Sequence, residues 1–335
     1  MRGFMVKQNA EPSVVVIGGG TGLSNMLKGL KLRTSKLTAI VTMADDGGSS
    51  GMLRDELGMP PPGDVRNCLQ ALANTEPTME RLLAYRFSEG VLKGQSLGNL
   101  FLAALNDMSD SFVDAVRRLS EVLAITGRVL PVTNEDVRLM ARFDDGTEVF
   151  GESNIREQKK QTDKRITKVM LIPEKPPALK ESLDAIKQAE MIILGPGSLY
   201  TSIIPNLLTD GVAEAIENSE ALKIYVLNVS TQDGETEQYT ASDHVRALFY
   251  HSGRKLFDYC LANSTPLPED IAARYSEQGA SQTVVDEAEL ERLGVTTILR
   301  PMLDCTSGLA RHNPQRLADE IMSLYREKSP TRIFG

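Results

Sequence analysis

Two glycine-rich segments each follow a run of aliphatic residues, as phosphate-binding loops often do. Residues 18–22 (Gly-Gly-Gly-Thr-Gly) follow the aliphatic run 14–17, and residues 195–198 (Gly-Pro-Gly-Ser) follow the run 191–194. Glycine lets backbone N–H groups approach an anion closely, and the N-terminus of a following helix adds partial positive charge. Glycine at these places also serves tight turns, but four glycines in the first loop exceed what a turn needs. The pair predicts a nucleotide-sized ligand held across a sheet.

A pair of carboxylates, Asp45 and Asp46, follows the next aliphatic run and precedes Gly-Gly-Ser-Ser-Gly. An acid at this place in a nucleotide-binding sheet accepts hydrogen bonds from ribose hydroxyls. Paired carboxylates also suit Mg²⁺ bound together with phosphates. The alternative is that they cap the following turn or helix. Their crowding with small residues favours a ligand site.

Two catalytic or cofactor motifs are matched only in part. The first loop approaches the dinucleotide fingerprint G-x-G-x-x-G, but Leu23 stands at its last position, which keeps an NAD-type ligand as an alternative. Residues 47–51 match G-x-S-x-G, yet two aspartates separate them from the strand, and the chain has only three histidines. A serine hydrolase is therefore disfavoured. Further polar residues near predicted turns or helix starts are individually more typical of caps: Arg66, Asn67, Ser96, Asn99, Asn228, Tyr239, Arg311 and His312.

The elements that must position these residues follow the period of the apolar pattern. Residues 14–17 and 37–43 are predicted strands, and 23–32 is an amphipathic helix, which together form a parallel βαβ unit. Helices are predicted near 65–73, 79–87, 97–106 and 112–123. They make a helical insertion at about residues 64–126.

A second insertion, of β structure, is predicted at about residues 128–172. Asp144-Asp145-Gly146 between two short β runs indicates a hairpin, and 166–172 is a further strand. The polar stretch 152–165 is expected to be exposed and mobile. Strand and helix alternation then resumes, with strands at 191–194, 223–228, 257–261 and 296–300 and helices at 179–188, 212–218, 241–250 and 314–325. We therefore predict a tail at 1–12 and one α/β domain at 13–330, a mostly parallel sheet with helical and β-hairpin insertions.

Composition excludes several classes of protein. The chain has 335 residues, 41% of them hydrophobic, and a formal net charge of −8 without a long basic block. That disfavours nucleic acid as a partner. No apolar run reaches the roughly 18 residues that a membrane span needs. The N-terminus lacks the apolar stretch of a signal peptide, and the three cysteines have no C-x-x-C spacing, so we expect a cytoplasmic protein.

Taken together, six motifs resemble the gluconeogenesis factor family (YvcK-like), which is related to 2-phospho-L-lactate transferase (CofD). The resemblance spans about residues 14–311. It implies a Rossmann-like α/β fold in a cytosolic bacterial protein. The motifs are Gly-Gly-Gly-Thr-Gly (18–22), Ala-Asp-Asp-Gly-Gly-Ser-Ser-Gly (44–51), Pro-Pro-Gly-Asp-Val-Arg-Asn (61–67), Ser-Leu-Gly-Asn-Leu (96–100), Gly-Pro-Gly-Ser-Leu-Tyr-Thr-Ser (195–202) and Tyr-Thr-Ala-Ser-Asp-His-Val (239–245).

The resemblance also implies a set of ligand-binding residues. Two positions depart from the family pattern: Gln95 stands where relatives often have His, and Asn313 follows Arg-His where Asp is common. Asp45 and Asp46 are in addition the candidate Mg²⁺ ligands. The implied set is Gly19, Gly20, Thr21, Gly22, Asp45, Asp46, Asn67, Gly195, Gly197, Ser198, Asn228 and Arg311.

Relatives on the transferase side join a phospholactyl group to a deazaflavin with a guanosine nucleotide donor and Mg²⁺. The gluconeogenesis factors are tied to cell shape and envelope-precursor supply on gluconeogenic carbon, and the resemblance implies binding of UDP-sugars such as UDP-N-acetylglucosamine. We therefore expect a nucleotide-sugar-binding regulator, with a CofD-type transferase and an NAD-type dinucleotide-binding protein as alternatives. No catalytic residue is assigned from the sequence, and a homodimer is left open.

Overall fold

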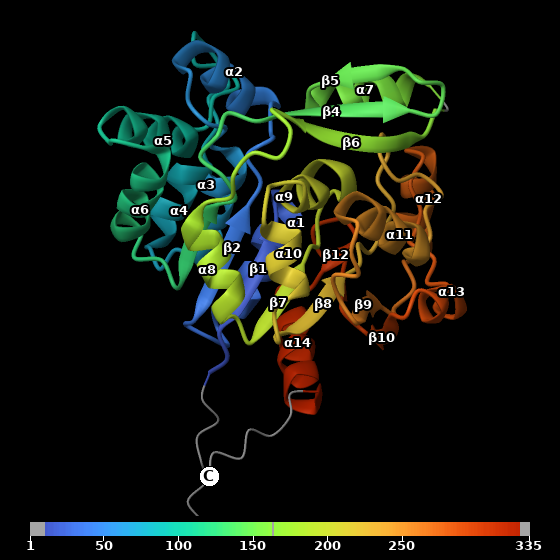
Figure 1. The fold of residues 1–335 in the computed structure, drawn as a ribbon. Helices are drawn as coiled ribbons and strands as arrows, with labels where there is room; N and C mark the ends of the chain where they lie inside the picture. Colours follow the sequence, from blue (N-terminus) through green and yellow to red (C-terminus); the bar gives the residue numbers. More distant parts are fainter. Residues whose placement is uncertain (1–10, 163, 329–335) are drawn as a thin grey trace, which may run out of the picture.

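Seven parallel strands form the central sheet of the computed structural model, which describes residues 11–162 and 164–328 (Figure 1). The central strands are aliphatic and buried on both faces, as parallel strands covered by helices must be. Neighbours in the sheet follow the order β10-β9-β8-β7-β1-β2-β3. The strands are β1 (Val14–Gly18), β2 (Leu37–Val41), β3 (Arg128–Pro131), β7 (Met191–Leu194), β8 (Leu222–Val226), β9 (Tyr259–Asn263) and β10 (Thr296–Arg300).

The strand order reverses between β1 and β7. From β1 the chain adds β2 and then β3 on one side, and β7 returns to the other side of β1, followed by β8, β9 and β10. In open α/β sheets such a reversal opens a crevice at the carboxyl ends of the two strands, where ligands bind. Both glycine-rich loops leave the sheet at this reversal, so the predicted α/β, Rossmann-like fold is confirmed.

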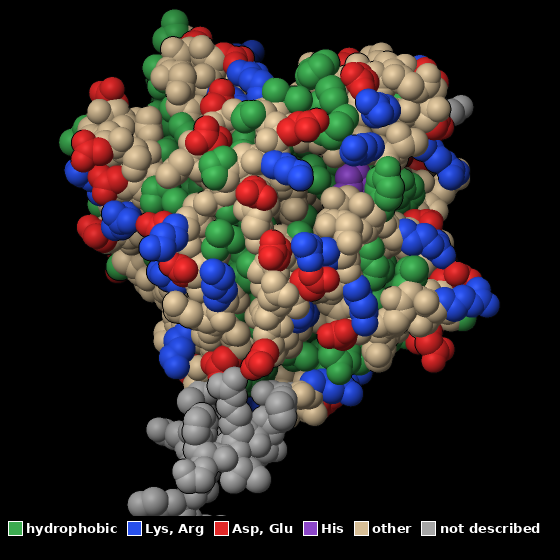
Figure 2. All heavy atoms as spheres, in the orientation of Figure 1, with side chains coloured by type: hydrophobic (Ala, Val, Ile, Leu, Met, Phe, Trp, Pro, Cys, Tyr) green, Lys and Arg blue, Asp and Glu red, His purple; other side chains and the backbone are tan. Residues whose placement is uncertain are grey.

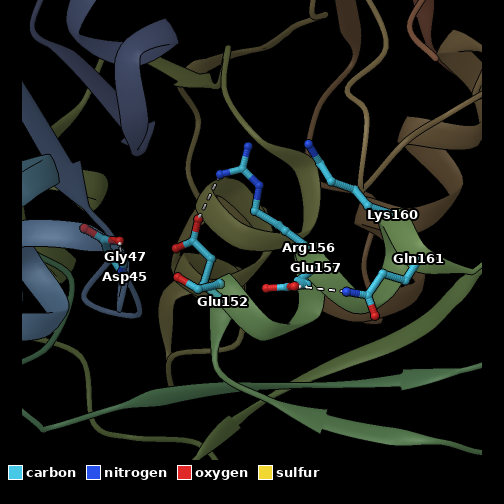
Figure 3. A pocket seen from close by; sticks show the side chains of 8 residues that line it. Asp45, Gly47, Glu152, Arg156, Glu157, Lys160 and Gln161 are labelled. Atoms are coloured by element: carbon cyan, nitrogen blue, oxygen red, sulfur yellow. Dashed lines mark hydrogen bonds and ion pairs between the residues drawn. The ribbon is translucent and has the colours of Figure 1, made fainter. Parts of the chain in front are cut away.

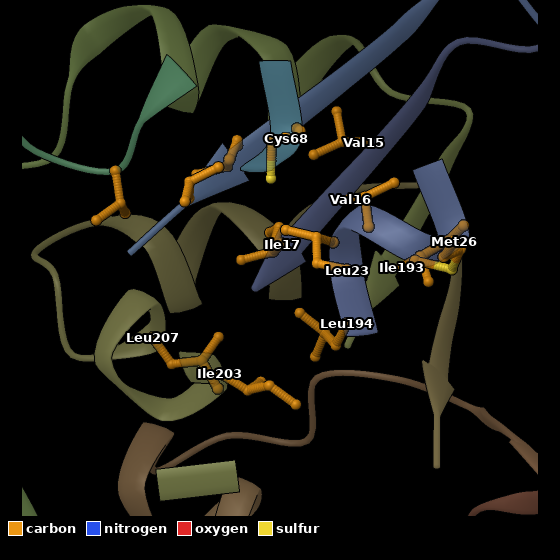
Figure 4. Close-up of a cluster of buried hydrophobic side chains, with 14 of the residues drawn as sticks. Val15, Val16, Ile17, Leu23, Met26, Cys68, Ile193, Leu194, Ile203 and Leu207 are labelled. Carbon is orange, nitrogen blue, oxygen red and sulfur yellow. The ribbon is translucent and has the colours of Figure 1, made fainter. Parts of the chain in front are cut away.

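Helices cover both faces of the sheet and close a continuous core. On one side α1 (Gly20–Leu30), α3 (Gly63–Leu72) and α14 (Pro314–Lys328) pack together. The other group comprises α8 (Lys180–Gln188), α9 (Ile204–Leu207), α10 (Val212–Glu217) and α11 (Ala241–Ser252), of which α8 and α10 lie in front of the strands in Figure 1. Figure 4 shows Ile17 and Leu194 of adjacent strands among the buried side chains of this core.

The helical block is preceded by one helix that the sequence did not predict. The expected helices are present as α3, α4 (Pro77–Ala84), α5 (Leu97–Asp107) and α6 (Phe112–Val122). The addition is α2 (Gly48–Leu57), whose first turn is the Gly-Ser-Ser-Gly segment. Glycine disfavours helix interiors, but Gly51 is needed here because a Cβ at this position would collide with the backbone carbonyl of Asp46.

The expected hairpin forms a separate antiparallel sheet above the carboxyl ends of the central strands (Figure 1). Its order is β5 (Glu148–Phe150), β4 (Arg138–Phe143) and β6 (Ile166–Ile172). The stretch 152–165, which was expected to be exposed and mobile, is exposed only in part and is helical for most of its length. Residues Glu152–Gln161 form α7, which buries Ile155 completely and packs on β4 and β5. The strand β3 pairs with β2, so residues 128–131 belong to the central sheet rather than to this insertion.

The other differences concern boundaries and small elements. The helix α1 begins three residues before the predicted Leu23, because Gly20, Thr21 and Gly22 form its first turn. Short elements that were not predicted include η1 (Leu199–Ile203, a π-helical turn) with α9 directly after it, α12 (Glu269–Glu277), α13 (Glu287–Arg292) and an antiparallel pair of β11 (Leu303–Asp304) with β12 (Arg311–His312). Most of the predicted tail, residues 1–10, lies outside the described residues.

Candidate functional site

Two hollows open at the carboxyl edge of the sheet and share Asp45 and Gly47 as a common wall. One, of about 470 Å³, lies against α7, and we call it the α7 hollow. The other, of about 590 Å³, lies among α2, α3 and α5, and we call it the helical hollow. Ligand sites of this class occupy roughly 300–1,000 Å³. Figure 2 shows a notch at the upper edge of the molecule, between the α2 end and the antiparallel sheet.

The two glycine-rich loops pack against each other through their backbones. A Cβ on Gly22 would lie 2.7 Å from the carbonyl oxygen of Pro196, and a Cβ on Gly197 would lie 3.0 Å from that of Gly19. Asn228 holds the second loop, because its Oδ1 accepts from the N–H of Gly197 at 3.0 Å and its Nδ2 donates to the same residue's carbonyl at 2.7 Å. Glycine is therefore required here by loop-to-loop contact, and Asn228 positions the loop.

The first loop also rests on a carboxylate, that of Asp64 in the first turn of α3. The N–H of Gly20 donates to this carboxylate, and a Cβ on Gly19 would collide with it. Burial, and then the nearby charge of Asp45, raises the pKa of Asp64 to about 7. One of the N–H groups expected to face a phosphate is thus already bonded to Asp64, whereas helix geometry leaves those of Thr21 and Gly22 without partners inside α1.

Asp45 and Asp46 point to different partners. Asp45 lines both hollows and accepts from the N–H of Gly47 at 3.0 Å, and burial raises its pKa. Asp46 accepts from the N–H of Ser153 at 2.9 Å and thereby caps the first turn of α7. The two predicted Mg²⁺ ligands do not converge, and the described residues contain no group of three or more His, Cys, Asp or Glu arranged to hold a metal ion.

The helix α7 supplies charged side chains that the sequence analysis did not assign to the site. Glu152, Arg156 and Lys160 line the α7 hollow, and Figure 3 shows Glu152 on the side that faces Asp45. Burial, and after it the charges of Asp45 and Asp64, raises the pKa of Glu152 well above its ordinary value. Their spacing of four residues, which places side chains on one helix face, was the signal that could have identified them.

A second buried carboxylate supports the loop at 195–198. Glu235 accepts from the N–H groups of Tyr200 and Thr201, at 3.1 and 3.0 Å, at the start of η1. Burial raises its pKa to about 7. Ser198 is bonded to the side-chain amide of Gln232 at 2.8 Å, in the same segment as Glu235. These contacts hold the second glycine-rich loop and the turn that follows it in place.

The helical hollow brings together several polar residues that the sequence left as scattered. Asn67, a predicted ligand-binding residue, lines it beside Arg66, Arg86 and Asn99. Ser49 lines it from the first turn of α2.

Arg311 is placed apart from both hollows. It lies exposed on β12, which packs on α1, where Asn25 donates to the carbonyl of His312 at 2.7 Å. Arg311 lines neither hollow. Its predicted role toward a ligand stays a prediction.

Comparison with known proteins identifies the family. A family model described as "2-phospho-L-lactate transferase CofD" matches residues 14–303. A putative gluconeogenesis factor of Thermoanaerobacterium thermosulfurigenes is 52% identical, covering 93% of this chain and 97% of the relative. This chain belongs to the gluconeogenesis factor family.

Further gluconeogenesis factors agree in length and structure. That of Bacillus subtilis is 45% identical, over 95% of this chain and 99% of its own length. A crystal structure of a UPF0052 family member from Bacillus halodurans superposes with a TM-score of 0.89 at 46% identity, covering 93% of this chain and 99% of that one. The resemblance to the gluconeogenesis factors is thus confirmed over nearly the whole chain. None of the helices among residues 11–162 and 164–328 has the length and hydropathy of a membrane span.

Proposed function

We propose that this gluconeogenesis factor binds a nucleotide sugar of the UDP-N-acetylglucosamine type and acts in the cytoplasm as a regulator of cell shape and envelope-precursor supply on gluconeogenic carbon. The observation that carries the proposal is the reversal of strand order between β1 and β7, with a glycine-rich loop at each strand end. Ligands of open α/β sheets bind at this place. The α7 hollow opens at the end of the neighbouring strand β2, where Asp45 and Gly47 line it.

The α7 hollow has the charges that a diphosphate needs. Arg156, which lies 3.9 Å from Glu152, and Lys160, which pairs with Asp233 at 2.7 Å, provide cations in the hollow. The first turn of α1, whose residues are not among those that line the hollow, offers N–H groups at the positive end of a helix. Glu152 and Asp45 provide carboxylates that can accept from ribose or sugar hydroxyls. If Mg²⁺ accompanies the phosphates, Asp45 fits it better than Asp46, because Asp45 lines the α7 hollow whereas Asp46 caps α7.

A CofD-type transferase is the second candidate, and a specific observation favours it. Asp64 has a pKa of about 7 beside Asp45, and a carboxylate poised near neutral pH can serve as a general base. The NAD-type alternative has less support, because Leu23 closes the first loop with a buried side chain where the fingerprint needs glycine.

Calorimetry with UDP-N-acetylglucosamine, GDP and NAD, each with and without Mg²⁺, tests the proposal. We expect UDP-N-acetylglucosamine to bind and Lys160→Gln to weaken it about tenfold, as loss of one phosphate contact does. Lys168→Gln, which removes an exposed lysine on β6, is the control. A preference for NAD or GDP would contradict the proposed ligand.

Mass spectrometry separates the regulator from the enzyme. UDP-N-acetylglucosamine incubated with the protein and Mg²⁺ should be recovered intact. Turnover that is lost in Asp64→Asn would replace the regulatory proposal by the transferase.

A further inference from the structure

The helical hollow contains two arginines that have no carboxylate partner. Arg66 comes from α3, and Arg86 follows α4. Within residues 11–162 and 164–328 neither guanidinium lies within 4.0 Å of a carboxylate oxygen. Burial, and after it the charge of Arg86, lowers the pKa of Arg66, while the charges of Asp64 and Asp45 act in the opposite direction. Two like charges that face one hollow favour an anion between them.

Polar side chains, most of them buried, hold Arg66 in a fixed orientation. Its Nε donates to Oδ1 of Asn99 at 3.0 Å, and its Nη1 donates to Oε1 of Gln70 at 2.7 Å. Asn99 in turn donates to Oγ of Ser49 at 2.9 Å, and Ser49 donates to Oε1 of Gln95 at 2.6 Å. These contacts use Nε and Nη1, which leaves Nη2 to face a ligand. A guanidinium oriented in advance loses less entropy when it binds an anion.

The N-termini of three long helices also reach this hollow. Gly48 begins α2, Gly63 begins α3, and Asn99 lies in the first turn of α5, and all three residues line the hollow. Each N-terminus carries partial positive charge. Arg86 is bonded to the carbonyl of Gly94, which also lines the hollow.

The acidic groups of the hollow are Asp45 and Asp64. A Cβ on Gly63 would lie 2.9 Å from Oδ2 of Asp45, which places that carboxylate against the start of α3. Asp64 receives the N–H of Gly20. Asp45 is thus held by the N–H of Gly47 and Asp64 by that of Gly20, and neither forms an ion pair with Arg66 or Arg86.

We propose that the helical hollow is a second anion site, separate from the nucleotide site, which binds a small dianion such as a phosphate monoester or a dicarboxylate. Guanidinium groups bind both through paired N–H···O bonds. The site does not depend on the proposed nucleotide sugar. Because Asp45 and Gly47 line both hollows, occupation of one affects the other.

Titration of the full chain with inorganic phosphate and, separately, with malonate tests the site. We expect saturable binding of at least one of them, weakened about tenfold in Arg86→Gln and in Arg66→Gln. The guanidinium of Arg86 is exposed and, among the described residues, bonded to Gly94 alone, so its replacement leaves the fold intact, whereas Arg66→Gln also disturbs the buried contacts. Arg81→Gln, an exposed arginine on α4, is the matched control and should bind like the wild type.

Three results would overturn the second site. These are no saturable binding of either anion, equal binding by wild type and Arg86→Gln, or competitive loss of phosphate binding when UDP-N-acetylglucosamine is added. In the last case the arginines hold the nucleotide's own phosphates. If phosphate binds but UDP-N-acetylglucosamine does not, the proposed function fails and the anion site stands.

Discussion

The protonation of one side chain at the site, that of Asp64, affects the stability of the whole fold. Its pKa of about 7 means that the folded protein binds this proton more tightly than the unfolded chain does. Its contribution to stability is therefore fully present below the ordinary pKa of 3.8 and is lost as the pH rises through about 7. Ionisation of Asp64 costs free energy because its carboxylate is buried under the first glycine-rich loop, next to the charge of Asp45.

Asp64→Asn keeps the acceptor for the N–H of Gly20 and removes this charge. We expect its free energy of unfolding to gain on that of the wild type between pH 5 and 8.5, by about 2.7 kcal/mol for a folded pKa of about 7, and its melting temperature to gain several degrees. Thermal unfolding followed by circular dichroism at both pH values measures this. Asp107→Asn, which removes an exposed carboxylate at the end of α5, should show no such pH-dependent gain. An equal effect of Asp64→Asn at both pH values would contradict the raised pKa.

Asp46 has a structural role that its position in the motif did not reveal. Replacing it by Ala removes the acceptor for the N–H of Ser153, and loss of a helix cap costs about 1 kcal/mol. We expect Asp46→Ala to lower both stability and UDP-N-acetylglucosamine affinity, because α7 carries Arg156 and Lys160. Asp46→Asn, which keeps an oxygen acceptor, should be milder in unfolding and calorimetry. If both variants lose affinity equally and only with Mg²⁺ present, Asp46 acts as a metal ligand instead.

At the level of elements, the antiparallel sheet is attached to the main body through histidine and tyrosine side chains. The Nε2 of His251 on α11 accepts from the N–H of Val169 on β6 at 3.0 Å, while its Nδ1 lies 2.7 Å from the carbonyl of Ala247. The hydroxyl of Tyr200 on η1 lies 3.4 Å from the carbonyl of Ile166. His251 must be neutral to accept, and burial lowers its pKa.

Acid should therefore weaken the protein through His251. The unfolded chain takes up a proton near the ordinary pKa of 6.5 and the folded chain does not, so stability falls as the pH drops below 6.5. Between pH 7.5 and 5 we expect the wild type to lose more unfolding free energy than His251→Gln, by up to about 1.4 kcal/mol per pH unit for one proton. Urea unfolding at the two pH values measures both losses. Equal losses would show that His251 is not the group responsible.

The strands were predictable from sequence to a degree that the helices at the site were not. Val14–Gly18 and Met191–Leu194 are aliphatic throughout because parallel strands are buried on both faces, and so both glycine-rich loops were found. The helix α7 buries only Ile155 and is otherwise polar, which gives no apolar periodicity. The helix α2 begins with Gly-Ser-Ser-Gly, which is typical of a loop.

The same reason explains which site residues were missed. Asp45 and Asn67 belong to conspicuous motifs and do line the hollows. Glu235 lies far along the chain from the loop that it supports, and only the three-dimensional contacts show this. Arg86 lies outside every motif that the sequence analysis used.

At the scale of the whole molecule, the site lies where two insertions, the helical block and the antiparallel sheet, meet at the end of strand β2. The helical block and the antiparallel sheet lie on either side of the segment that follows β2, and Asp45 and Gly47 line the hollows of both. Asp46 ties that segment to α7, and Gly51 packs α2 on it. A ligand bound at this segment must therefore affect both α2 and α7, which are far apart in the sequence.

Hydrogen exchange measured with and without UDP-N-acetylglucosamine tests this coupling. We expect slower exchange in α7 and, together with it, in the first turn of α2, because ordering of the segment between them reduces local opening of both. The helix α13, which packs on α11 and β10 away from the two hollows, is the internal control and should not change. In the same experiment with Asp46→Ala, exchange should still slow in α7, which contacts the ligand, but no longer in the first turn of α2. The reason is that the bond between the segment after β2 and α7 is absent in this variant. Protection confined to α7 in the wild type would mean that the two insertions respond independently.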